Sequence, residues 1–125
     1  MSTGPLNTLE SEADMKKILI VDDSRAMRML VTRALRQAGY GESVILEASD
    51  GVAALDVIGR EEPDVVLSDW NMPNMLGIDL LRAVRSGGSK VRFGFITSEV
   101  NDAIKEQARA AGAAFLISKP FTAER

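Results

Sequence analysis

The stretch KILIVDDS, residues 17–24, joins a short apolar run to a group of acidic and hydroxyl side chains. Residues 18–21 are all aliphatic, without alternation of polar and apolar side chains, which is typical of a strand buried on both faces of a parallel sheet. Asp22, Asp23 and Ser24 follow directly, and residues of these types commonly begin helices. The stretch therefore predicts a buried strand that leads into a helix.

The same unit, a strand followed by a helix, repeats along the chain. The first helix is marked by apolar residues at helical spacing from Met27 to Ala38, with Gly39 as a suitable end. Further strands are predicted at 44–46, 64–68, 93–96 and 114–117. Further helices are predicted where apolar residues recur at Val52, Leu55 and Ile58, at Ile78, Leu81 and Val84, and at Val100, Ile104, Ala108 and Ala111.

Five strands alternating with four helices predict an α/β fold, a doubly wound five-stranded parallel sheet. For a sheet of this size we expect the flavodoxin-like strand order 2-1-3-4-5. Residues 122–125 resemble the first turn of another helix, so we expect the last helix to be truncated. We assign residues 16–125 to the domain and interpret residues 1–15 as a flexible N-terminal extension. A short extra helix in 1–15, covering the last strand, is the alternative.

Length and composition exclude several functions. The chain has 125 residues, of which 46% are hydrophobic and 26% charged, as in one globular domain. It contains neither Cys nor His, which excludes disulfides, thiolate metal sites and catalytic histidines within the chain. The formal net charge is −3, so we expect no nucleic-acid or membrane partner. Because the sequence shows neither a membrane span nor a secretory signal, we expect a cytoplasmic location.

Polar side chains gather at the carboxyl ends of the predicted strands. Asp22 and Asp23 end the first strand, and Asp69 ends the third. Thr97 ends the fourth strand, and Lys119 follows the fifth. Each residue alone would more often be a cap, a turn residue or a solvated lysine. Because ligands of open parallel sheets bind beyond the carboxyl ends, where the strand order reverses, their joint occurrence indicates a site.

Three close carboxylates repel one another unless a cation lies among them. Without His and Cys, the ligands in this chain are oxygens, which favours a hard cation. Mg²⁺ fits best because it keeps several waters and uses few protein ligands. We expect a loop carbonyl just after Asp69 to complete the set.

The chain resembles the receiver domain of two-component response regulators over residues 16–121. Four motifs carry this resemblance: Ile-Val-Asp-Asp-Ser (20–24), Asp-Trp-Asn-Met-Pro-Asn-Met (69–75), Ile-Thr-Ser-Glu (96–99) and Lys-Pro-Phe (119–121). The loop after Asp69 is especially similar to that of single-domain chemotaxis response regulators.

The resemblance implies that Asp69 accepts a phosphoryl group from a histidine kinase or a histidine phosphotransfer protein. Thr97 would hydrogen-bond one phosphoryl oxygen, and Lys119 would neutralise another. Phosphoryl transfer depends mainly on positioning and charge compensation, which agrees with these roles. The chain would then assist its own phosphorylation and dephosphorylation rather than act as an ordinary enzyme. It would signal to an output domain or protein by a population shift.

The resemblance also implies a Mg²⁺ site. Asp23, Asp69 and the backbone carbonyl of Asn71 would bind the ion directly, and Asp22 would hold a water of the ion. Two other functions that use an aspartate or a phosphate fit less well. Phosphohydrolases that form an aspartyl phosphate typically carry Asp-x-Asp after the first strand, and an acidic first loop would repel the phosphate of a flavin nucleotide. A receiver that only binds partners is disfavoured by the complete set of acids, threonine and lysine.

Two positions near the site lead to further expectations. Leu116 stands where the family usually has an aromatic residue, and the neighbouring Phe115 should face the opposite side of its strand. Trp70, the only tryptophan, directly follows Asp69. If it begins the loop, its indole should be partly exposed at the rim of the site.

Overall fold

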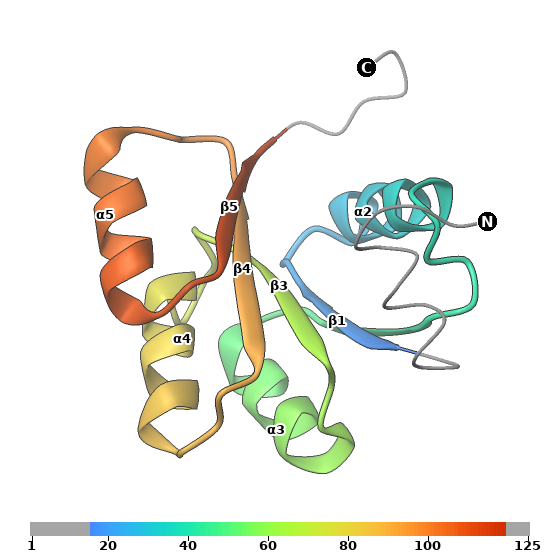
Figure 1. The fold of residues 1–125 in the computed structure, drawn as a ribbon, viewed down its shortest axis with the longest axis horizontal. Helices are drawn as coiled ribbons and strands as arrows, with labels where there is room; N and C mark the ends of the chain where they lie inside the picture. Colours follow the sequence, from blue (N-terminus) through green and yellow to red (C-terminus); the bar gives the residue numbers. More distant parts are fainter. Residues whose placement is uncertain (1–15, 120–125) are drawn as a thin grey trace, which may run out of the picture.

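The computed structural model describes residues 16–119, in which five strands and four helices alternate along the chain (Figure 1). The strands are β1 (Lys17–Val21), β2 (Val44–Ala48), β3 (Val65–Asp69), β4 (Arg92–Thr97) and β5 (Phe115–Ser118). The helices are α2 (Arg25–Gln37), α3 (Gly51–Glu61), α4 (Gly77–Ser86) and α5 (Asp102–Ala111). The predictions of a truncated last helix and of a flexible extension at 1–15 concern residues outside the described range.

The strands form one parallel sheet with the order β2-β1-β3-β4-β5, which confirms the predicted flavodoxin-like topology. α2 lies on one side of the sheet, and α3, α4 and α5 lie on the other (Figure 1). β1 and β3 are neighbours, with Val21 opposite Ser68. Asp22 and Asp69 therefore leave the same edge of the sheet side by side.

Side-chain caps set where helices begin at this edge. Ser24 precedes α2, and its hydroxyl accepts a hydrogen bond from the N–H of Met27 at 3.1 Å. Asn101 does the same for α5, accepting from the N–H of Ile104 at 2.9 Å. Because Asn101 caps the helix, Val100 lies outside it and is exposed, so the inclusion of Val100 in the helical stripe was wrong. None of the helices in the described part of the chain is long and apolar enough to cross a bilayer.

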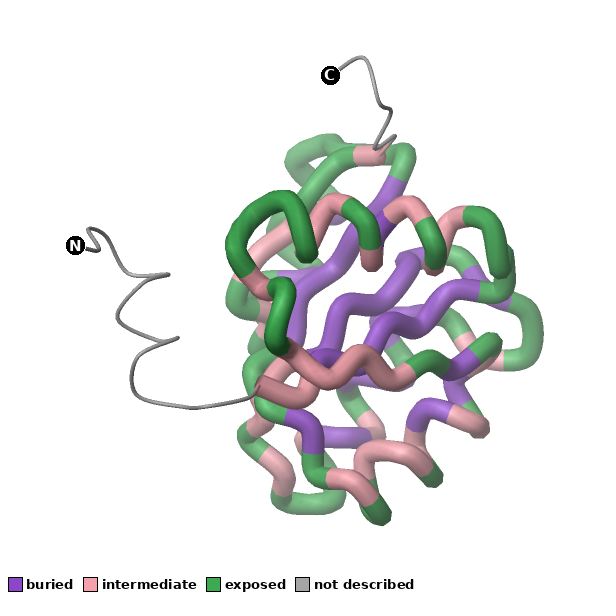
Figure 2. The backbone as a smooth tube through the Cα atoms, turned by 90° about the vertical axis from the view of Figure 1, so that its right-hand side faces the viewer, coloured by how far each residue is buried: buried purple, intermediate pink, exposed green. Residues whose placement is uncertain are grey.

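The sheet separates two hydrophobic clusters of unequal size. The larger lies between the sheet and α3, α4 and α5, and includes the fully buried Leu80, Phe93 and Phe95. The smaller lies on the α2 side, around Ile18 and Val31. Full burial of one such side chain stabilises the fold by about 1.5–3 kcal/mol, so the larger cluster contributes most. The buried backbone runs through the middle of the molecule, and exposed segments surround it (Figure 2).

Candidate functional site

Three carboxylates meet at the carboxyl edge of the sheet. One oxygen from each of Asp22, Asp23 and Asp69 lies within 4.8 Å of the other two. Asp22 directly follows β1 and is buried, as is Asp69 at the end of β3, whereas Asp23 is exposed. The structure thus brings together the three acids that sequence reasoning selected.

The loop that carries Asp22 is held by several hydrogen bonds. One carboxylate oxygen of Asp22 accepts from the N–H of Ser24 at 2.8 Å. Its backbone carbonyl accepts from the guanidinium of Arg28 at 2.6 Å, and the same guanidinium pairs with Glu47 at 2.7 Å. Sequence reasoning missed Arg28 and Glu47, because a charged residue on an amphipathic helix or at a strand end is usually solvated. No sequence signal separates them from such residues.

Lys119 places its ammonium between two of the acids. Its Nζ lies 3.2 Å from an oxygen of Asp22 and 3.2 Å from an oxygen of Asp69. Burial lowers the pKa of Lys119, but the carboxylates of Asp22 and Asp69 outweigh it and leave that pKa raised. The amine therefore stays charged at neutral pH, where it balances the negative charge of the acids in part.

The surroundings of Asp69 disfavour its charged form, whereas those of Lys119 favour the charged form. Burial, followed by the negative charge of Asp22, raises the pKa of Asp69 above its usual range, and Lys119 opposes the rise. An ionised Asp69 is therefore destabilised by its surroundings when no further cation is present. The site holds a carboxylate that gains from any additional positive charge.

Thr97 and Asn71 lie on the neighbouring segments. Thr97 ends β4 and is fully buried, and its carbonyl accepts from the N–H of Lys119 at 2.7 Å. Its hydroxyl oxygen accepts from the N–H of Glu99 at 3.2 Å, which leaves the hydroxyl proton available as a donor. Asn71 is exposed in the loop two residues after Asp69. A backbone hydrogen bond thus joins Thr97 to Lys119, while Asn71 lies in the loop that begins after Asp69.

Trp70 is buried, contrary to the prediction that its indole is partly exposed. Its indole is 7% exposed and packs edge-to-face on Phe95, with ring centroids 4.8 Å apart. The loop turns back beside it, because the N–H of Gly77 donates to the carbonyl of Trp70 at 2.8 Å. Gly77 approaches the chain so closely that a Cβ there would collide with the carbonyl of Asp69. The prediction of a partly exposed indole was wrong, because this tight turn carries the ring into the core.

Leu116 and Phe115 lie as expected on opposite faces of β5. Leu116 packs against the larger hydrophobic cluster, and Phe115 packs against the smaller one. No aromatic ring from β5 therefore lies on the side of the larger cluster, where Leu116 packs.

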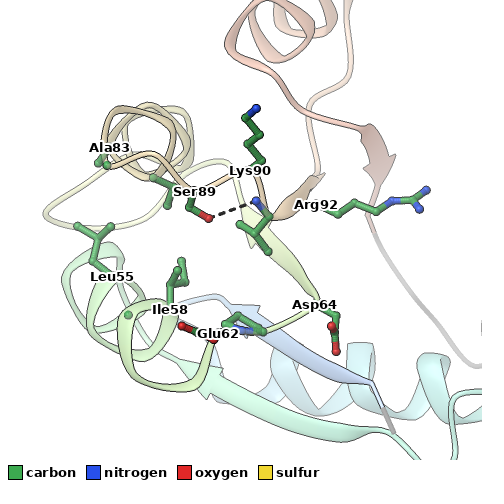
Figure 3. A pocket seen from close by; sticks show the side chains of 13 residues that line it. Leu55, Ile58, Glu62, Asp64, Ala83, Ser89, Lys90 and Arg92 are labelled. Atoms are coloured by element: carbon green, nitrogen blue, oxygen red, sulfur yellow. Dashed lines mark hydrogen bonds between the residues drawn. The ribbon is translucent and has the colours of Figure 1, made fainter. Parts of the chain in front are cut away.

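A hollow at the opposite end of the sheet offers a contrast. It has a volume of about 640 Å³ and lies between the ends of α3 and α4 (Figure 3). Leu55, Ile58 and Ala83 line it, and the side chains of Lys90 and Arg92 extend away from it. Ser89 uses its hydroxyl to accept from the N–H of Val91 at 3.2 Å. The polar groups there do not converge as they do around Asp69.

Comparison with known proteins identifies the family. The model of the response regulator receiver domain matches residues 18–125. The chain belongs to this family. The receiver domain is 37% identical over 117 residues to a probable chemotaxis protein CheY of Rhizobium etli, covering 92% of this chain and 89% of the relative. It is 41% identical over 111 residues to the chemotaxis protein CheY of Pseudomonas aeruginosa, covering 86% of this chain and 87% of the relative.

Solved structures agree with the assignment. The receiver domain matches the chemotaxis protein CheY4 of Vibrio cholerae with a TM-score of 0.77 at 36% identity, covering 88% of this chain and 91% of the other. It matches the receiver domain of the putative response regulator NarL of Mycobacterium tuberculosis with a TM-score of 0.77 at 38% identity, covering 86% of each chain. The protein is therefore a receiver domain of the CheY-like response regulators of two-component signalling.

The acidic cluster of this receiver domain fits a magnesium ion. Its ligand atoms are all carboxylate oxygens within 4.8 Å of one another, and hard cations prefer such ligands. Burial first, and then the charge of Asp22, raise the pKa of Asp69, and Lys119 offsets only part of this rise. A divalent cation among these oxygens would relieve the repulsion.

Proposed function

We propose that residues 16–125 form a phosphoacceptor module in which Asp69 takes a phosphoryl group from a phosphohistidine. The donor would be a histidine kinase or a histidine phosphotransfer protein, and the product would change contacts with an output domain or protein. One observation carries the proposal: the Asp69 carboxylate lies in a buried site with Lys119 at 3.2 Å. A cytoplasmic location remains a prediction.

In the proposed step, a carboxylate oxygen of Asp69 attacks the phosphorus atom. An O–P bond forms, the N–P bond of the phosphohistidine breaks, and its electron pair stays on the imidazole nitrogen. The phosphoryl group adds negative charge to a site that already holds three acids. The ammonium of Lys119 balances part of this charge, and the hydroxyl of Thr97 donates a hydrogen bond to a phosphoryl oxygen.

Asp23, Asp69 and the carbonyl of Asn71 would hold Mg²⁺, with Asp22 reached through a water. When bound, the ion supplies positive charge that compensates the phosphoryl oxygens during transfer. The arginine contact to the carbonyl of Asp22 keeps the acidic loop in position for this role. The same groups would also assist hydrolysis of the phosphoryl group from Asp69. We therefore propose that the chain acts only on its own phosphoryl group and is not an enzyme for another substrate.

Treatment with acetyl phosphate and Mg²⁺, followed by intact-mass spectrometry, tests the acceptor. The wild type should gain the mass of one acid-labile phosphoryl group, and Asp69→Asn should gain none, because an amide cannot form the acyl phosphate. Asp64→Asn, which changes an exposed acid at the other end of the sheet, is the matched control and should be phosphorylated like the wild type. A phosphorylated Asp69→Asn protein would overturn the assignment.

The metal ligands are tested separately by melting the protein with and without Mg²⁺. Asp23→Ala should melt higher than the wild type without Mg²⁺, because one repelling charge is gone. It should also lose most of the rise in melting temperature that Mg²⁺ gives the wild type. An equal rise in both proteins would show that Asp23 does not bind the ion.

A further inference from the structure

The loop between β3 and α4 lies beside the acidic cluster and carries a proposed ligand. This loop, residues 70–76, includes Asn71, whose carbonyl would bind Mg²⁺. Asn71 is exposed, but the residues on either side of it, Trp70 and Met72, are buried in the larger hydrophobic cluster. The N–H of Gly77 closes the loop on the carbonyl of Trp70 at 2.8 Å. The position of the Asn71 carbonyl therefore depends on how the rest of the loop packs.

The second half of loop 70–76 packs on the first turn of α3. Met75 is half-buried, and its side chain lies over Gly51, the buried first residue of that helix. A Cβ at Gly51 would lie 2.6 Å from the sulfur of Met75, 2.9 Å from its Cβ and 3.0 Å from its Cγ. These distances are shorter than the roughly 3.5 Å of carbon–carbon contact, and no rotamer of Met75 moves its Cβ. A larger residue at this position would therefore push the loop and α3 apart.

The start of α3 is also held against the other side of the acidic cluster. The carboxylate of Asp50 caps the helix, because it accepts from a backbone N–H of the first turn at 2.8 Å. Two residues before Asp50, the carbonyl of Ala48 accepts from the N–H of Asp22 at 3.1 Å. The connection between β2 and α3 thus contacts the acidic loop through Ala48 and loop 70–76 through Gly51.

We propose that Gly51 is a positioning residue of the metal site and sets the spacing of the two loops that supply its ligands. Because Gly51 has no side chain, Met75 can approach α3, and this contact holds loop 70–76 at a fixed distance from the acidic loop. Gly51 supplies no ligand and acts only through Met75. The inference rests on the metal site of the proposed function.

Space, and not backbone conformation, accounts for a glycine at this position. The φ of Gly51 lies outside the left-handed region, so alanine can adopt the same backbone conformation. Alanine is also the better helix former, so helix propensity alone would favour it. Gly59 in the same helix provides the contrast, because a Cβ there would meet no other described element within 4 Å. Gly51→Ala and Gly59→Ala therefore differ in the contact with Met75.

Titration of these variants with Mg²⁺, followed by ¹H–¹⁵N NMR, tests the proposal. Gly51→Ala should shift the amide signals of Asn71 and Met72 already in the Mg²⁺-free protein, because the loop is displaced. It should also weaken Mg²⁺ binding by about 10-fold, as is typical when a residue that orients a metal ligand is changed. Gly59→Ala should leave these signals and the affinity unchanged. Unmoved loop signals in Gly51→Ala, or an affinity equal to that of the wild type, would overturn the proposal.

A double-mutant cycle with Met75→Ala shows whether Gly51 acts through Met75. Met75→Ala removes the contact without adding volume and should weaken Mg²⁺ binding by about 3-fold, so it also provides a test if Gly51→Ala does not fold. In the Met75→Ala background the sulfur and the Cγ that oppose a Cβ at Gly51 are gone. Gly51→Ala should then weaken binding by at most about 3-fold further. An unchanged affinity in Met75→Ala, or an equal effect of Gly51→Ala in both backgrounds, would overturn the proposal.

Val84→Ala separates this effect from a general loss of stability. It leaves a cavity under the last turn of α4, far along the helix from loop 70–76, and should lower the melting temperature without changing Mg²⁺ affinity. A loss of affinity as large as that of Gly51→Ala would overturn the proposal. A wild-type protein that binds no Mg²⁺ would overturn the metal site and this proposal together. Wild-type binding that Gly51→Ala leaves unchanged would overturn this proposal alone.

Discussion

Two lysines form ion pairs with carboxylates at opposite ends of the same sheet, and they differ mainly in burial. Lys17, at the amino end, pairs with Glu61 at 3.5 Å, where the side chains are 44% and 38% exposed. Lys119, at the carboxyl end, lies 3.2 Å from Asp22 and from Asp69, and its side chain is 15% exposed. Water screens the first pair, whereas the second group interacts at low dielectric with one positive charge against two negative ones. The proposed phosphorylation site is therefore at the end of the sheet where the charges are buried and only partly balanced.

Removing Lys119 should have the largest effect on this contrast. Lys119→Met leaves Asp22 and Asp69 facing each other without their ammonium. We expect the Mg²⁺-free protein to lose about 3 kcal/mol of unfolding free energy at pH 7, at the lower end of the cost of breaking a buried pair. Urea unfolding with EDTA measures this loss. Added Mg²⁺ should restore more stability to this variant than it adds to the wild type, and a loss under about 1 kcal/mol would contradict the claim that burial strengthens the pair.

The second-largest expected effect is the pH dependence of protein stability that Asp69 causes. Because its folded-state pKa is raised, the folded protein keeps the proton of Asp69 to higher pH than the unfolded chain does. Without Mg²⁺, stability should therefore fall as the pH rises from the unfolded pKa, near 3.8, through the folded value, and stay lower above it. Asp69→Asn should remove the loss of stability that ionisation of Asp69 causes. This variant should therefore melt a few degrees higher than the wild type at pH 7.

Melting curves between pH 4 and 8 in EDTA check this prediction. Asp64→Asn, at the exposed end of the sheet, should follow the wild-type curve. Parallel curves for wild type and Asp69→Asn would show that Asp69 is not destabilised when ionised.

A smaller effect is expected at Arg28, which holds the acidic loop without touching a ligand. Its guanidinium binds the carbonyl of Asp22 and pairs with Glu47. Arg28→Ala should weaken Mg²⁺ binding by roughly 3- to 10-fold, which corresponds to one hydrogen bond of about 1 kcal/mol. Fluorescence of Trp70, one residue after Asp69, provides the titration signal.

Arg28→Lys should recover part of the affinity, because an ammonium can reach either partner but not both at once. An unchanged Mg²⁺ affinity in Arg28→Ala, despite a lowered melting temperature, would limit Arg28 to a structural role.

The smallest effect belongs to the exposed pair. Lys17→Met and Glu61→Gln should each change the unfolding free energy by less than about 0.5 kcal/mol, since exposed ion pairs contribute little. Neither should alter the response to Mg²⁺. Urea unfolding beside Lys119→Met makes the comparison direct, and a loss as large as that of Lys119→Met would remove the distinction between the two ends.

The sequence was sufficient for the fold because its pattern is local and repeated. Apolar runs such as residues 18–21, the cap at Ser24 and the glycines after helices each act within a few residues. The convergence of Asp22, Asp69 and Lys119 followed from the rule that strand ends share an edge. Their roles in phosphoryl transfer remain predictions.

Two features were beyond the sequence because they depend on tertiary packing. Trp70 is polar at one end and apolar elsewhere, so only the turn at Gly77 and the position of Phe95 decide that it is buried. Arg28 has the same helical position as many solvated arginines, and only the path of the backbone at Asp22 gives it a partner. Side-chain contacts between segments far apart in sequence leave no periodic signal.

The pairing of Lys119 with Asp22 also bears on synthesis of the chain. The two residues are 97 positions apart, so the acidic loop leaves the ribosome long before its ammonium. At about 5–20 residues per second, the delay is about 5–20 s. During that interval a nascent chain already has Asp22, Asp23 and, later, Asp69, but no Lys119 to balance them. The site becomes complete only when β5 adds to the edge of the sheet, so newly made protein cannot acquire its full charge balance before translation of the described chain is finished.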